Sequence, residues 1–173
     1  MYPKEYIQFL AHFHGDRDYF ECHEVLEEYW KKTDSKNKSS IWVGLILLAV
    51  STYHHRRSNF IGAKRTLKKA FMIFNTQAGW LIKLGLDQPL LNDILKERLS
   101  VIEKEEAYYS FDLPICDSIL KEMCGEYCEQ EGLLWGKASD FTKSSLIHRH
   151  KLRDRTSVIE ERRQSLKIRK GRE

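Results

Sequence analysis

The sequence has few residues that interrupt helices and few long apolar runs. It contains 9 glycines and 3 prolines in 173 residues, which excludes a collagen-like or Pro/Gly-rich disordered chain and favours helices. The longest apolar run, from Ile41 to Val50, is about half of the roughly 20 residues that a membrane-spanning helix needs. The N-terminal residues include Lys4 and Glu5 and lack the small-residue cleavage site of a secretory signal. We therefore expect a cytoplasmic protein with no membrane contact.

Cysteine is also scarce, with 4 residues in the chain. Without a secretory context we expect reduced thiols rather than disulfides. Cys124 and Cys128 would share one face of a helix, but their spacing is CxxxC and no paired histidines follow. The pattern favours buried structural thiols over a metal or redox pair.

Charge is distributed unevenly along the chain. The net charge is +4, of which residues 142–173 carry +7 and residues 1–141 carry −3. We therefore predict one helical domain over residues 1–141, with its motif-bearing core at 5–78, and a basic, partly ordered tail over 142–173. Such a tail could contact nucleic acid weakly and without sequence preference, or remain a solvated segment.

Apolar residues recur at helical spacing throughout the chain, and turn signals divide it into about five or six helices. Asp18 is well placed to cap a helix that begins at Tyr19, with Glu21 three residues further along. The expected helices cover residues 4–14, 19–32, 41–57, 60–78, a segment around 91–102, and 117–130. No alternation of strands and helices occurs, so the sequence predicts an all-α, single-domain antiparallel bundle.

The helix expected at residues 19–32 carries polar groups on an unexpected face. At 100° per residue, Phe20, His23, Glu24 and Glu27 lie within about 80° of one another. A surface helix normally separates apolar from charged residues, so an imidazole and two carboxylates beside an aromatic ring depart from the pattern. We call His23, Glu24 and Glu27 the His/Glu cluster and treat it as the candidate site.

The His/Glu cluster permits two kinds of chemistry. Together with His54 from the next helix, it offers the nitrogen and oxygen ligands that a divalent transition metal such as zinc, iron or manganese accepts. Without a metal, a histidine between carboxylates is a candidate proton donor or acceptor, which makes the cluster a candidate catalytic site. Four neighbouring residues are candidates to bind a small ligand: Phe20, Glu21, Trp30 and Asn59.

Two known metal motifs are excluded. The run from His23 to Glu27 is similar to the zinc-protease motif HExxH, but Glu27 stands where the second histidine should be. The Glu-x-x-His pairs of di-iron bundles do not occur at Glu21, Glu24 or Glu27. A purely structural hydrogen-bond network between helices is the alternative interpretation of the cluster.

Two blocks of sequence resemble a family of bacterial and archaeal proteins, domain-of-unknown-function family 309. The first block is Phe13-x-Gly15-x-x-x-Tyr19-Phe20-Glu21-x-His23-Glu24-Val25-Leu26-Glu27-x-x-Trp30, and the second is Gly44-Leu45-Ile46 to Ala49, Tyr53-His54, Arg57, Asn59 and Ala63. The match covers about residues 5–78 and implies a small all-α bundle with no established activity. It also implies that the family's polar motif falls on Glu21, the His/Glu cluster and His54. The chain departs from the pattern at Ser58, where glycine is expected, and at His14, where asparagine is usual.

A non-enzymatic role is the second hypothesis. The helix pair at 41–57 and 60–78 resembles a tetratricopeptide hairpin, but no second copy follows at a period of ~34 residues. Five aromatic residues could form a partner-binding surface or a homodimer interface: Tyr19, Tyr29, Trp30, Trp42 and Tyr53. A scaffold that binds a protein partner, with a basic tail that contacts nucleic acid non-specifically, is therefore the alternative to a metal or small-ligand site.

Overall fold

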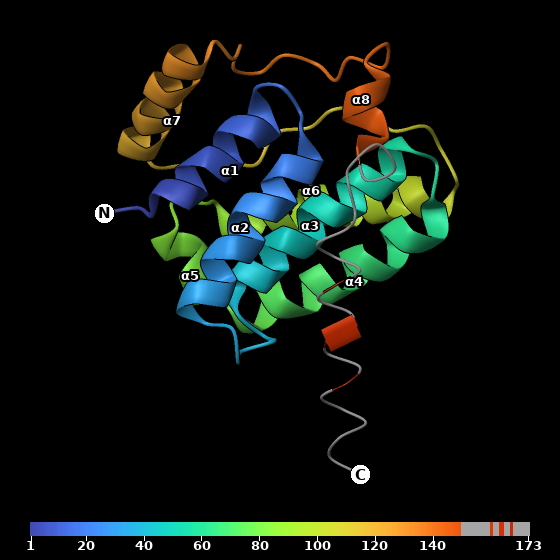
Figure 1. Ribbon diagram of the computed structural model, residues 1–173, viewed down its shortest axis with the longest axis horizontal. Helices are drawn as coiled ribbons and strands as arrows, with labels where there is room; N and C mark the ends of the chain where they lie inside the picture. The colour runs from blue at the N-terminus through green and yellow to red at the C-terminus, as the bar shows by residue number, and fades with distance from the viewer. Residues whose placement is uncertain (150–159, 161–162, 165–166, 168–173) are drawn as a thin grey trace.

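The computed structural model describes residues 1–149, 160, 163–164 and 167, and this part of the chain is helical (Figure 1). Its helices are α1 (Lys4–His14), α2 (Tyr19–Thr33), α3 (Ile41–Arg56), α4 (Phe60–Thr76), α5 (Ala78–Lys83), α6 (Gln88–Glu103), α7 (Ser118–Glu131) and α8 (Ser144–Ile147). An isolated antiparallel bridge joins Leu86 to Ile115, and the described residues contain no strand. The all-α class is confirmed. The expected number of helices is too low because α5 and α8, with 6 and 4 residues, are too short to show hydrophobic periodicity.

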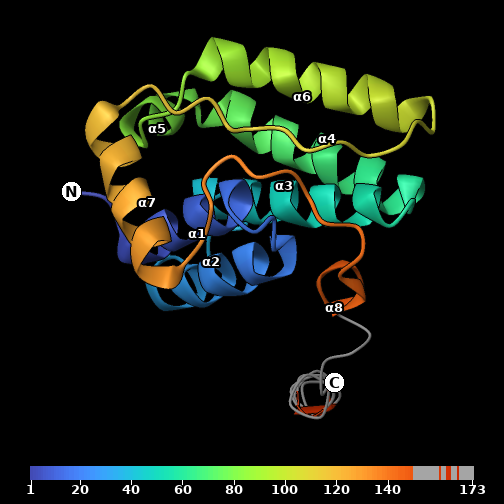
Figure 2. The ribbon, with the colours of Figure 1, turned by 90° about the horizontal axis from the view of Figure 1, so that it is seen from above.

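Helix α3 occupies the centre of the bundle. It packs against α2 on one side and α4 on the other, and α6 covers the far side of α4 (Figure 2). Helix α7 crosses α1 at one end of the bundle (Figure 2). Because α3 is covered on several sides, it is apolar nearly all round and most of its residues are buried. Within the described part of the chain, no helix has the length and apolar character of a membrane-spanning segment.

The starts of α2 and α4 are fixed by side-chain caps. Asp18 Oδ1 accepts a hydrogen bond from the Glu21 amide at 3.0 Å, as the sequence predicts. Asn59 Oδ1 accepts one from the Gly62 amide, also at 3.0 Å. Ser58 before it adopts a φ of 57°, in the left-handed region that favours glycine. This backbone geometry explains why the family pattern has glycine at the position of Ser58.

Two buried arginines tie later segments to the first three helices. Arg17 donates to the Phe111 and Lys137 carbonyl oxygens, both at 2.7 Å, and to Asp112 Oδ1 at 2.8 Å. Arg56 donates to the Ser139 hydroxyl at 3.0 Å. The segments that follow α6 and α7 are thus held against the α1–α2 turn by hydrogen bonds to charged groups.

The basic tail predicted for residues 142–173 lies largely outside the described residues. Its described part begins with α8, where Ile147 is buried. Arg56 Nη2 donates to the Leu146 carbonyl oxygen at 3.3 Å, and Arg57 Nε donates to His148 Nδ1 at 3.3 Å. The end of α3 therefore anchors the chain as far as residue 149.

Candidate metal centre on helix α2

The imidazole of His23 lies between two carboxylates of its own helix. Its Nδ1 is 3.2 Å from Glu24 Oε1, and its Nε2 is 3.1 Å from Glu27 Oε2. The contact with Glu27 follows from helix geometry, because residues four apart are neighbours on one face. Lys31 is four residues further along and places its ammonium 3.1 Å from Glu27 Oε1. The cluster is half-buried, with His23 26% exposed and both glutamates 32% exposed.

These contacts change the protonation of His23 and Glu27. Burial disfavours the charged ring, but the hydrogen bonds to Glu24 and Glu27 outweigh it and raise the pKa of His23 to about 9. The hydrogen bond from His23, assisted by Lys31, lowers the pKa of Glu27 to about 2 although burial opposes this. With this pKa, His23 is mainly an imidazolium at neutral pH, and its two nitrogens donate to Glu24 and Glu27.

The same three side chains have the geometry of metal ligands. His23, Glu24 and Glu27 each offer one ligand atom, and these atoms lie within 4.8 Å of one another. Glu24 faces Nδ1 and Glu27 faces Nε2, so one carboxylate has to turn towards the other ring nitrogen before all three side chains reach one ion. A bound cation would take the place of the proton on one of the two ring nitrogens of His23.

His54 lies outside this group of ligand atoms. Its Nδ1 faces the Asn59 side-chain amide at 3.1 Å, and the same Asn59 caps α4. Partial burial, followed by the charges of Arg57 and Arg65, lowers the pKa of His54, so its ring is neutral at pH 7. His54 is half-buried rather than directed into the core, whereas the adjacent His55 is buried and contacts the Glu106 carbonyl oxygen at 2.9 Å.

Of the four ligand-binding candidates, Phe20 and Glu21 lie beside the cluster. The Phe20 ring is 5.8 Å from that of His23 and 6.0 Å from that of Tyr53 on α3. Glu21 is adjacent on the same turn, and its carboxylate is 3.3 Å from Arg149 Nη2. Phe20 therefore lies between His23 of the cluster and Tyr53 of α3 and contacts both rings.

Trp30 and Asn59 serve other parts of the structure. The Trp30 indole donates to the Asn37 carbonyl oxygen at 3.1 Å, and Lys38 Nζ lies 4.6 Å from its ring centre. Trp30 thus holds the α2–α3 loop. Asn59 fixes the start of α4 and the ring of His54.

Arg149 is a neighbour of the cluster that the motif analysis does not identify. It pairs with Asp18 and Glu21, and its guanidinium lies 5.9 Å from the Phe20 ring centre. The excess of basic residues after residue 141 is the sequence signal that could have indicated a cationic partner for these carboxylates, although the sequence analysis connects it with nucleic acid or solvent. The contact makes the C-terminal segment part of the surroundings of the cluster.

The comparison with known proteins places this site within a family. The family described as "Domain of unknown function (DUF309)" matches residues 6–66, which include the whole His/Glu cluster. The chain is also 45% identical over 170 residues to "Uncharacterized protein YpuF" of Bacillus subtilis (strain 168), covering 98% of both chains. The chain belongs to the DUF309 family. The relationship extends beyond the matched block through almost the full length of the YpuF protein. No solved structure matches the chain.

Proposed function

We propose that this protein binds a divalent transition metal through His23, Glu24 and Glu27. The observation that carries the proposal is the convergence of one imidazole and two carboxylates within 4.8 Å on a single helix. One nitrogen and two oxygen donors suit zinc, iron(II) or manganese. Three protein ligands leave at least one coordination position for water or a small ligand, as in catalytic rather than closed structural sites.

The surroundings of the cluster support a site rather than a simple surface ion pair. Phe20 shields one side of the His23 ring, and Asp18 and Glu21 add negative charge one turn earlier on α2. A negative potential favours a cation at the cluster. Lys31 and Arg149 are basic groups that pair with these carboxylates. A metal ion would compete with Lys31 for the Glu27 carboxylate, whereas Arg149 pairs with Asp18 and Glu21, which are not among the three ligands.

Isothermal titration calorimetry with zinc and manganese chloride tests the proposal. Tag-free wild-type protein is expected to bind one equivalent, and His23→Gln and Glu27→Gln are expected to abolish binding or weaken it at least about 10-fold. The measurement is made at pH 8, because protons compete with the metal for His23. His12→Gln is a matched control, since His12 also faces a carboxylate four residues away, Asp16 at 3.1 Å.

The control variant should bind the metal like the wild type. Equal binding by all four proteins would place the metal elsewhere, and no binding by the wild type would reject the proposal. In the second case the cluster is a packing network, and a scaffold that binds a partner becomes the favoured function.

A further inference from the structure

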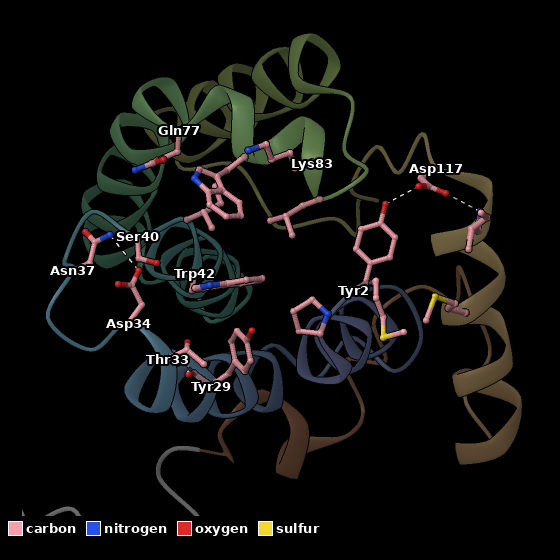
Figure 3. Close-up of a pocket in the computed structure, with 17 residues that line it drawn as sticks. Tyr2, Tyr29, Thr33, Asp34, Asn37, Ser40, Trp42, Gln77, Lys83 and Asp117 are labelled. Atoms are coloured by element: carbon pink, nitrogen blue, oxygen red, sulfur yellow. Dashed lines mark hydrogen bonds between the residues drawn. The ribbon is translucent and has the colours of Figure 1, made fainter.

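A second candidate binding site lies at the end of the bundle where α2 ends and α3 begins. It is a cavity of about 900 Å³ (Figure 3). Its lining comes from the N-terminus, the ends of α2 and α3, α5 and the start of α7, and contains no member of the His/Glu cluster. Cavities that bury small molecules usually have volumes of about 300–1,000 Å³. The cavity is large enough for a molecule with one or two rings.

Aromatic side chains provide the walls of this cavity. Trp42 lies near its centre, and the Tyr29 ring meets it edge-on with centroids 5.0 Å apart (Figure 3). Trp80 faces the same space from α5 and is 49% exposed. Such an exposed indole beside buried apolar groups, here Ile41 and Leu84, offers a surface on which a flat ring can stack. The walls therefore favour an aromatic ligand.

The start of α3 supplies hydrogen-bond donors to the cavity. Ser40 is the N-cap of this 16-residue helix and is only 3% exposed, yet its side chain makes no capping hydrogen bond. Among the described residues, none pairs with the Ser40 hydroxyl, which belongs to the cavity lining. The first amide groups of α3 have no acceptor within the helix, and the helix dipole adds partial positive charge there. This end of the cavity is suited to an anionic group.

The charged residues around the cavity carry both signs. The Lys83 ammonium lies over Trp80, 4.9 Å from the ring centre, and no described carboxylate forms an ion pair with it. Asp34 already accepts a hydrogen bond from the Asn37 side chain at 3.2 Å. Asp117 accepts one from the Tyr2 hydroxyl at 2.6 Å and caps α7. These partners are neutral groups, so Asp34 and Asp117 keep their negative charge, and the preference for an anion rests on Ser40, Lys83 and the first amides of α3.

We propose that this cavity binds an aromatic carboxylate. Its ring stacks against Trp42 and Trp80, and its carboxylate lies at the start of α3, where the Ser40 hydroxyl and main-chain amides donate to it. Lys83 adds positive charge to the same cavity. The site is separate from the proposed metal centre, and its test does not depend on metal binding.

Titration calorimetry with 1-naphthoate and with neutral 1-naphthalenemethanol tests the proposal. The wild type is expected to bind 1-naphthoate about 10-fold more tightly than the alcohol, because only the carboxylate gains charge-assisted hydrogen bonds. Ser40→Ala and Lys83→Gln should each weaken naphthoate binding several-fold and leave alcohol binding unchanged. Trp80→Leu, a change at an exposed position, should weaken binding of both probes.

Lys96→Gln is the matched control, because Lys96 is an exposed lysine on α6 that does not line the cavity. It should bind both probes like the wild type. Equal affinity for the acid and the alcohol, unchanged naphthoate binding in both Ser40→Ala and Lys83→Gln, or no naphthoate binding by the wild type would each overturn the proposal. The proteins' thermal unfolding midpoints establish that the variants are folded.

Discussion

His23 Nε2 lies 3.1 Å from Glu27 Oε2, one helical turn further along α2. The pair is half-buried, so each charge is partly removed from water; Glu24 also stabilises the charge of His23, and Lys31 that of Glu27. The pKa of His23 is raised to about 9 and the pKa of Glu27 is lowered to about 2. The free energy of unfolding should consequently depend on pH through the contacts of His23 with Glu24 and Glu27.

The first prediction concerns the free energy of unfolding of wild type and His23→Gln. The raised pKa of His23 means that its contribution is complete below an unfolded value of about 6.5 and is lost as pH rises through about 9. The lowered pKa of Glu27 means that its contribution is complete above an unfolded value of about 4.5 and is lost as pH falls through about 2. The free energy of unfolding of the wild type should therefore exceed that of the variant by the largest amount between about pH 4.5 and 6.5.

We expect a difference of about 1–2 kcal/mol in that window, smaller than the full pKa shift would give because the pair is partly solvated. Urea denaturation at pH 5.5, 7.5 and 9.5 measures it, with metal chelated throughout. The difference should shrink steadily towards pH 9.5. A difference that is independent of pH would show that His23 contributes packing rather than charge.

The second prediction separates two roles of Asp18. Its carboxylate caps α2 through the Glu21 amide and also pairs with Arg149. Asp18→Ala should lower the free energy of unfolding by about 1–2 kcal/mol, because a helix amide loses its acceptor. Asp18→Asn keeps a capping oxygen and loses only the ion pair. Since Arg149 is 44% exposed, this variant and Arg149→Ala should each cost less than about 1 kcal/mol.

Chemical denaturation at low and high salt distinguishes these contributions. The small loss in Asp18→Asn and in Arg149→Ala should diminish in high salt, whereas the loss in Asp18→Ala should persist. The double variant Asp18→Asn/Arg149→Ala should be about as stable as Arg149→Ala alone, because that change already removes the contact with Asp18 together with those with Glu21 and Phe20. Arg149→Ala costing as much as Asp18→Ala would mean that the C-terminal segment, and not the cap, fixes the start of α2.

The first four helices were predictable because capping and turn residues next to them in the sequence mark their boundaries. Asp18 and Asn59 cap α2 and α4 in the structure, and the expected and observed starts of both helices agree. Helix α5 is not among the predicted helices, because it has only 6 residues and contains Gly79, a residue type that disfavours helices. Local signals define long capped helices well and single turns poorly.

The environment of the candidate site was less predictable. The polar stripe of α2 identified His23 and Glu27, whose contact depends only on helix geometry. Helix α3 is apolar nearly all round, so periodicity did not indicate that His55 rather than His54 is buried. His55 is enclosed by Tyr108, whose ring centre is 5.8 Å away, from a segment more than fifty residues further along the chain. Such contacts depend on tertiary structure alone.

The last prediction concerns the close contact between α3 and α4 at Gly44. A Cβ atom at this position would lie 2.7 Å from Cε1 of Phe74, a fully buried residue, and 3.1 Å from Cγ2 of Ile73. Alanine normally stabilises a helix interior relative to glycine by about 0.5–1 kcal/mol. Overpacking costs about 1–3 kcal/mol, so Gly44→Ala should lower the free energy of unfolding by about 1–2 kcal/mol.

Gly79→Ala is the matched control, because Gly79 also lies inside a helix but no atom lies within 4 Å of the added Cβ. It should raise the free energy of unfolding by up to about 1 kcal/mol through helix propensity alone. Thermal and urea unfolding of both variants measure the two effects. Stabilisation by both substitutions would mean that α3 and α4 separate easily at Gly44. A lower free energy of unfolding in Gly44→Ala together with a higher one in Gly79→Ala would establish that glycine is required at position 44 for close helix packing.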